Sequence, residues 1–275
     1  MSLVSLRLAG LKSGKKRRSR AVAALFTPIN CNTKRQDAAN SRGRSIPQIN
    51  NDRYEGPQDR YGEVYPMPDI ACLGLLVADT VGATIDALPA RGTLALIDRI
   101  ELHTGGCAAN TGGALARIGV STAVLGKVGS DGYGDFMIRS LGEMGVDTRG
   151  IRRDASVATA STIVTVHSDA ERSFLHVIGA NAKLTAADVD WGIVDDGAKI
   201  FHIGGLQLMS AMEGDDAREV LKKAKGKGLL TTLDTVMNPR SRGWEGIAPA
   251  LPFLDWALPS IEEAKALTGE EKALR

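Results

Sequence analysis

Apolar residues gather in short runs along the chain, separated by glycine and aspartate turns. Residues 69–77, DIACLGLLV, are almost continuously apolar, as expected of a strand buried on both faces of a parallel sheet. Asp79 follows at, or just past, the carboxyl end of this predicted strand. Ligands of open α/β sheets bind at that end of the strands, so Asp79 is a candidate site residue, with a turn or cap residue as the plainer interpretation.

Two further segments have β character but no helix beside them. Residues 82–103 alternate loosely between apolar and polar positions, with Pro89 and Gly92 as interruptions, which predicts short strands. The runs 161–166 and 172–178 flank the turn sequence SDAE and predict a hairpin. We interpret 82–103, and with it the 161–178 hairpin, as a small β lid beside the main sheet.

The remaining apolar runs alternate regularly between strand and helix patterns. Strands are predicted over about 121–128, 199–203, 229–233 and 256–258. Helices are predicted over about 108–118, 131–144, 185–196, 213–225, 244–251 and 261–267. Such alternation predicts an α/β fold with a doubly wound, mostly parallel sheet.

The stretch 105–135 carries the clearest candidate chemistry. Gly105 and Gly106 can adopt backbone angles that other residues avoid, and they allow a ligand to approach the main chain closely. Asn110 falls in the first turn of the helix that follows, where a short amide can reach a bound hydroxyl. The stretch therefore predicts half of a small-molecule site, with a sugar hydroxyl as the ligand.

Charge divides the chain near residue 66. Residues 1–66 hold 13 Lys and Arg against 5 Asp and Glu, whereas the remainder holds 21 against 27. The acidic remainder argues against nucleic acid as a partner of the folded domain, which we place at 67–275. The basic segment 1–66 lacks periodicity and is predicted to be a disordered, dispensable extension, with an import or nucleic-acid patch and a transit peptide as alternatives.

Cysteine usage and hydropathy limit the cellular setting. The three cysteines are odd in number and widely spaced, which fits neither a disulfide framework nor a zinc site. No apolar run approaches the roughly 18 residues that span a bilayer. We therefore expect a cytoplasmic protein without a membrane partner. The histidines show no metal spacing and are interpreted as lid-surface or strand residues: His103, His167, His176 and His202.

Six motifs in order extend this pattern over about 200 residues. They are GLLVAD ending at Asp79, GGCAANTGGALARIG at 105–119, GKVGSDGYG at 126–134, GAN and LT at 179–185, LDT at 233–235 and LPSIEEAKALTG at 258–269. Together they resemble the ribokinase-like (PfkB) carbohydrate kinases, whose fold is a three-layer α/β sandwich with a β lid. The resemblance covers the substrate-binding half of that fold.

The resemblance implies transfer of a phosphoryl group from ATP to a sugar hydroxyl, with Mg²⁺. It implies that Asp79 and Asn110 bind sugar hydroxyls, and that Gly105 and Gly106 form a hinge and touch the sugar through the main chain. Glu263 matches the glutamate of the family's Asn-x-x-Glu pattern in the metal and phosphate region, where Ser260 replaces the asparagine and Asp234 lies at a strand end. Relatives often dimerise through the lid, so a homodimer is expected.

Two departures from the family pattern change this interpretation. Cys107 stands where relatives carry Lys or Asn, and is interpreted as a packing residue. The family's Gly-Ala-Gly-Asp motif, which supplies an anion hole and the catalytic base, is expected beyond Arg275, so we expect a C-terminally incomplete domain with most of the ATP site absent. A non-catalytic sugar-binding protein and a nucleoside kinase fragment remain alternatives. A nicotinamide enzyme is disfavoured because Gly-x-Gly-x-x-Gly is absent at 105–113 and 126–134.

Overall fold

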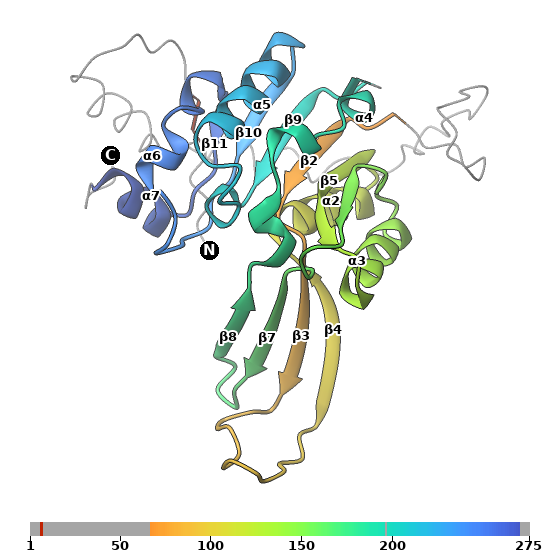
Figure 1. Ribbon diagram of the computed structural model, residues 1–275, viewed down its shortest axis with the longest axis vertical. Helices are drawn as coiled ribbons and strands as arrows, with labels where there is room; N and C mark the ends of the chain where they lie inside the picture. Colours follow the sequence, from red (N-terminus) through yellow and green to blue (C-terminus); the bar gives the residue numbers. More distant parts are fainter. Residues whose placement is uncertain (1–5, 8–66, 196, 270–275) are drawn as a thin grey trace, which may run out of the picture.

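The computed structural model describes residues 6–7, 67–195 and 197–269 of the chain. Within the predicted disordered extension it describes only β1 (Leu6–Arg7), and the rest of that prediction lies outside the described residues. The described part consists of a large sheet covered by helices and a small sheet that projects away from it (Figure 1). No helix within it has the length and apolar character needed to cross a membrane.

The large sheet is parallel except at one edge, as the alternating sequence pattern predicts. Its strands run in the order β1-β11-β10-β9-β2-β5-β6, and only β1 is antiparallel to its neighbour. Their bounds are β2 (Ile70–Gly74), β5 (Thr122–Gly129), β6 (Ile151–Asp154), β9 (Ile200–Gly204), β10 (Leu230–Leu233) and β11 (Trp256–Ala257).

Six α-helices of the described residues accompany this sheet, and apolar side chains pack against both of its faces. They are α2 (Cys107–Arg117), α3 (Gly132–Glu143), α4 (Trp191–Asp195), α5 (Asp215–Gly226), α6 (Trp244–Ile247) and α7 (Ile261–Thr268). Because successive side chains of a strand point to opposite faces, Leu73 joins the core that contains Leu221 of α5, whereas Cys72 joins the core that contains Met137 of α3. Two cores on opposite faces define the predicted doubly wound, three-layer arrangement.

Helix α5 shows how local sequence produces these layers. Its buried residues recur at helical spacing: Ala217, Val220, Leu221 and Ala224. Asp215 and Asp216 lie in its first turn, while Lys223 and Lys225 lie in its last turn, so both ends complement the helix dipole.

The small sheet has the strand order β4-β3-β7-β8. Its strands are β3 (Val77–Ala83), β4 (Arg99–Gly105), β7 (Ser161–Val166) and β8 (Arg172–Val177). The β3 strand is antiparallel to β4 and parallel to β7, while β7 is antiparallel to β8, so the sheet is mixed.

The first predicted strand requires correction. Residues 69–77 do not form one strand, because the core strand ends at Gly74 and a new strand of the small sheet begins at Val77. Asp79 therefore lies inside β3 and not at the end of a core strand. Of the segment 82–103, residues 84–98 contain no strand.

Three further local predictions differ from the structure. The helix expected over 185–196 is a 3-10 turn at Ala186–Asp188 followed by the short α4, because Asp188 folds back in a capping box with Thr185. The helix expected over 244–251 ends at Ile247, five residues before Pro252, which lies in a separate 3-10 turn. The β6 strand was not predicted, because IRRD carries only one apolar residue.

Candidate functional site

The site region lies where the large sheet changes winding direction. From the adjacent strands β2 and β9, the chain proceeds toward β5 on one side and toward β10 on the other, so a crevice is expected at their carboxyl ends. Glycines bring the main chains together there. A Cβ added to Gly74 would lie 2.1 Å from the carbonyl oxygen of Gly204, and one added to Gly204 would lie 2.8 Å from the nitrogen of Ala108, the second residue of α2.

Asp79 lies directly over the main chain of Gly105. It is the third residue of β3 and pairs with His103 of β4. A Cβ added to Gly105 would lie 2.1 Å from Asp79 Oδ2, so only glycine leaves room for this carboxylate. The Asp79 side chain is half-buried, and no described residue donates a hydrogen bond to it. Its oxygens are thus available to a ligand hydroxyl.

Gly106 connects this position to α2. It is the N-cap of the helix, with φ +94, a value that residues with side chains rarely adopt. A Cβ at Gly106 would lie 2.3 Å from the carbonyl oxygen of Leu75. Both glycines are therefore required by close backbone approaches, Gly105 toward Asp79 and Gly106 toward the end of β2.

Asn110 opens onto a neighbouring cleft. It is exposed in the first turn of α2 and lines a cleft of about 600 Å³ between β4, α2 and α3. The lining includes His103 of β4 but not Asp79, Gly105 or Gly106. The structure therefore brings Asp79, Gly105 and Gly106 together. The Asn110 nitrogen donates to the Gly106 carbonyl at 2.8 Å, but its side chain lines the cleft and makes no hydrogen bond to Asp79.

Asp234 and Cys107 form a second pair at the ends of β10 and α2. The Cys107 thiol is hydrogen-bonded to the Asp234 carboxylate, and burial together with that negative charge raises the pKa of Cys107. Burial raises the pKa of Asp234 to about 6, with the nearby Glu263 acting in the same direction. A raised pKa keeps Cys107 a thiol, which supports its interpretation as a packing residue.

Ser260 and Glu263 form a capping box at the N-terminus of α7. Ser260 is the N-cap, and its hydroxyl accepts a hydrogen bond from the Glu263 nitrogen at 3.3 Å. The Glu263 carboxylate accepts from the Ser260 nitrogen, the Thr235 hydroxyl and the Met237 nitrogen. Ser260, Glu263 and Asp234 thus lie near one another, and their role in binding metal and phosphate stays a prediction. Glu263 accepts three hydrogen bonds, whereas Asp234 is bonded by the Cys107 thiol and the Thr235 nitrogen.

Asn181 was not singled out from the sequence, although it belongs to the GAN motif. It is fully buried, donates from Nδ2 to the Leu76 carbonyl at 3.0 Å and accepts from the Leu76 nitrogen at 3.2 Å. Leu76 lies between β2 and β3, where the chain leaves the large sheet for the small one. The side-chain amide thus replaces a neighbouring strand at the connection that positions Asp79.

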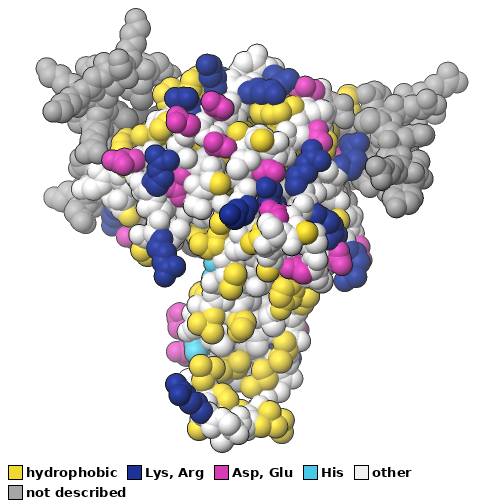
Figure 2. Space-filling view, in the orientation of Figure 1, with side chains coloured by type: hydrophobic (Ala, Val, Ile, Leu, Met, Phe, Trp, Pro, Cys, Tyr) yellow, Lys and Arg dark blue, Asp and Glu magenta, His cyan; other side chains and the backbone are white. Residues whose placement is uncertain are grey.

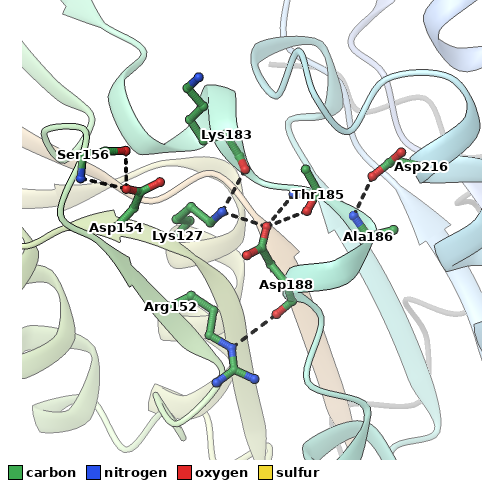
Figure 3. Close-up of polar contacts among 9 residues, drawn as sticks. All are labelled: Lys127, Arg152, Asp154, Ser156, Lys183, Thr185, Ala186, Asp188 and Asp216. Atoms are coloured by element: carbon green, nitrogen blue, oxygen red, sulfur yellow. Dashed lines mark hydrogen bonds and ion pairs between the residues drawn. The ribbon is translucent and has the colours of Figure 1, made fainter.

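The lysine and aspartate of the GKVGSDGYG motif also have structural partners. Lys127 of β5 donates to the Lys183 carbonyl at 2.9 Å and lies 2.8 Å from Asp188 Oδ2, whose carboxylate also caps Thr185 (Figure 3). Asp131 caps α3 and accepts from both the nitrogen and the hydroxyl of Thr159. Partial burial alone would raise the pKa of Asp131, but these hydrogen bonds outweigh it and lower the pKa. The motif therefore secures the loops on either side of the small sheet.

The fold and these motifs define the class of protein. Residues 67–274 match the model of the pfkB family carbohydrate kinases, and the chain belongs to that family. An uncharacterized sugar kinase of Pyrococcus horikoshii is 31% identical over 161 residues, covering 58% of this chain and 50% of its own length. Fructokinase-2 of Zea mays is 32% identical over 173 residues, covering 60% and 51%.

Solved structures agree with this assignment. The Pyrococcus horikoshii sugar kinase in complex with ATP gives a TM-score of 0.50 at 30% identity, covering 62% of this chain and 53% of that one. Fructokinase from Xylella fastidiosa with bound ATP gives 0.54 at 26% identity, covering 66% and 55%. Ribokinase of Arabidopsis thaliana gives 0.61 at 24% identity, covering 74% and 64%, and shares the fold. The chain spans about half the length of the curated relatives it matches.

Proposed function

We propose that this chain supplies the sugar-binding half of a carbohydrate kinase that transfers the γ-phosphoryl group of ATP to a sugar hydroxyl. The observation that carries the proposal is the Asp79 carboxylate held over Gly105, half-buried and free of hydrogen-bond donors among the described residues. A carboxylate in that setting is matched to ligand hydroxyls, because only a bound donor satisfies it away from water. Asn110, beside the same helix terminus, is proposed to bind a second hydroxyl.

Mg²⁺ and ATP are proposed as the cofactors of the whole protein. Relatives bound to ATP support the nucleotide. No described cationic side chain pairs with Asp234, and burial together with the charge of Glu263 raises its pKa to about 6. One carboxylate without an ion-pair partner suits Mg²⁺, which usually keeps several waters and binds phosphate oxygens. No cluster of three or more His, Cys, Asp or Glu able to hold a metal occurs in the described part, so a site formed by protein ligands alone does not fit.

In this proposal the chain's own residues bind and orient the sugar. Asp79 accepts hydrogen bonds from sugar hydroxyls, while Gly105 and Gly106 let the sugar approach the main chain next to the positive end of α2. Bound Mg²⁺ would offset negative charge on the phosphates. We assign no described residue as the catalytic base, and a non-catalytic sugar-binding role for the chain by itself is the second candidate.

A homodimer through the small sheet is proposed as the assembly. The face opposite Asp79 carries Ile100, Leu102, Ile163, Leu175 and Val177, each between 39% and 68% exposed. Yellow apolar side chains gather over this part of the molecule in Figure 2. An exposed apolar face of this kind marks an interaction surface. The cytoplasm is the proposed location, supported by Cys72 and Cys107 as free thiols, and neither nucleic acid nor membrane is a proposed partner.

The test is a screen of the 275-residue chain by saturation-transfer NMR against pentoses, hexoses, ketosugar acids and nucleosides. The proposal predicts that at least one sugar binds and gives a saturation-transfer signal, and that the chain with ATP and Mg²⁺ gives no turnover of that sugar. Binding of nucleosides alone would replace sugars with nucleosides as the substrate class. Binding of no compound in the screen would refute the sugar site, whereas turnover would show that the chain itself supplies a base.

A further inference from the structure

Four polar side chains form one row across the small sheet. His103 of β4 pairs with Asp79 of β3, Asp79 pairs with Thr162 of β7, and Thr162 pairs with His176 of β8. Residues directly opposite each other share a face of a sheet, so all four side chains are on the Asp79 face. With strands about 4.8 Å apart, the row extends about 14 Å, so its members can contact different hydroxyls of one bound sugar.

The outer pair of this row is organised by a hydrogen bond. Thr162, which is 7% exposed, shares a 3.1 Å hydrogen bond between Oγ1 and Nδ1 of His176. A bond to one ring nitrogen fixes the orientation of the imidazole and determines the tautomer at the other. His176 itself is exposed, and no described residue bonds its Nε2, so that nitrogen is available to a ligand on the same face as Asp79.

The other histidines of the small sheet are arranged differently. His103 Nε2 lies 3.1 Å from Glu101 Oε2 on its own strand, so its outer nitrogen is engaged. His167 Nε2 bonds Ser173 Oγ at 2.9 Å, at the turn that joins β7 to β8. Among these three histidines, His176 is therefore the one whose outer ring nitrogen, Nε2, has no bonding partner among the described residues, while His167 offers a matched control.

We propose that His176, held by Thr162, is a specificity-determining residue whose Nε2 hydrogen-bonds a sugar hydroxyl other than the one bound by Asp79. This inference rests on the proposed sugar site and deepens it. Partial burial lowers the pKa of His176, although the charge of Asp79 opposes the shift, so the ring is neutral near neutral pH. A neutral imidazole suits a hydroxyl better than a carboxylate or phosphate. Phe174, two residues away on the same face of β8, provides an apolar wall for the sugar carbons.

The experiment is a double-mutant-type cycle between protein and ligand. Binding of fructose, ribose and their monodeoxy analogues to the 275-residue chain is measured by titration calorimetry for wild type, His176→Leu and the control His167→Leu. His176→Leu should weaken binding of the better sugar about 10-fold, the effect of losing one hydrogen bond to the ligand. One deoxy analogue should bind wild type with an affinity reduced by a similar factor relative to its parent sugar. Its affinity should not fall further in His176→Leu.

Thr162 is tested as a positioning residue. Thr162→Val should change the tautomer balance of His176 in ¹⁵N spectra and reproduce part of the affinity loss, while Thr162→Ser should restore both. His167→Leu should leave affinity unchanged. If every deoxy analogue loses the same affinity relative to its parent sugar in wild type and in His176→Leu, His176 contacts no hydroxyl and the inference is overturned, even if Asp79→Asn weakens binding. If wild type binds neither sugar nor any analogue, both the proposed sugar site and this inference are refuted.

Discussion

At the scale of single residues, Gly105 and Gly106 have separable roles. Adding a methyl group to Gly105 would displace the Asp79 carboxylate, which is a side chain able to move. Adding one to Gly106 would meet the Leu75 carbonyl at 2.3 Å and strain a positive φ. One substitution should therefore damage binding, and the other should damage folding.

We predict that Gly105→Ala weakens sugar binding at least about 10-fold while changing the free energy of unfolding by less than about 1 kcal/mol. Gly106→Ala should instead cost about 2–4 kcal/mol of unfolding free energy, because backbone strain adds to a steric clash. Urea unfolding and calorimetry on the same two variants measure both quantities. Similar losses of stability in both would contradict the separation.

The buried His202 and the half-buried Asp234 predict opposing pH dependences. His202 of β9 is 6% exposed, and burial lowers its pKa from 6.5 to about 4. Between pH 6.5 and pH 4 the imidazole is protonated in the unfolded chain and neutral in the native state. The free energy of unfolding therefore falls by about 3 kcal/mol as the pH falls through this range. The pKa of Asp234 is raised from 3.8 to about 6, so between these pH values the carboxyl is protonated in the native state and ionised in the unfolded chain. Its effect is that the free energy of unfolding falls as the pH rises through this range.

The wild-type stability should therefore change little between about pH 4 and pH 6, because the two effects oppose each other. Asp234→Asn should unmask a fall of about 3 kcal/mol between pH 6.5 and pH 4, and adding His202→Gln should remove most of it. Urea unfolding at a series of pH values measures this. A flat profile in Asp234→Asn would show that His202 is accessible to protons in the native state.

At the scale of elements, the connection between the two sheets depends on Asn181. Its amide makes both hydrogen bonds to the main chain of Leu76, which is itself fully buried. We predict that Asn181→Leu costs about 2–4 kcal/mol of unfolding free energy, since two buried backbone groups lose their partners. It should also increase amide hydrogen exchange in β3 and weaken sugar binding through Asp79.

Asn238 is the matched control for this prediction. Its amide also makes two main-chain hydrogen bonds, to the Gln207 carbonyl and from the Arg240 nitrogen, but the side chain is only half-buried. Water can replace those partners, so Asn238→Leu should cost about 1 kcal/mol or less. Equal losses in the two variants would mean that Asn181 is not a special link between the sheets.

The sequence predicted most helices and strands of the large sheet because their apolar periods are strong. It misplaced Asp79 because nothing in the run DIACLGLLV marks the break after Gly74, where the chain passes from one sheet to the other. The partners of Asn181, Lys127 and Asp131 also escaped prediction, since they lie 105, 61 and 28 residues away. Periodicity reports local burial and carries no information about such distant pairs.

At the scale of the whole molecule, the exposed apolar face of the small sheet predicts self-association. The wild-type chain of 29.1 kDa should sediment as a dimer. Ile163→Lys places a charge in the middle of that face and should give a monomer with an unchanged fold. Leu94→Lys alters an equally apolar, exposed residue outside the four strands and should leave the dimer intact. A monomeric wild type in sedimentation equilibrium would refute the proposed interface.

The whole account depends on Asp79 binding a sugar hydroxyl over Gly105. The most direct measurement is calorimetric titration of the 275-residue chain with the sugar identified by screening. Wild type is compared with Asp79→Asn and with the control Asp98→Asn. The Asp98 carboxylate accepts a hydrogen bond from Thr84 in the loop between β3 and β4. We predict at least about a 10-fold loss of affinity for Asp79→Asn, with an unchanged unfolding midpoint and no effect of Asp98→Asn. Equal affinities of wild type and Asp79→Asn would contradict the account.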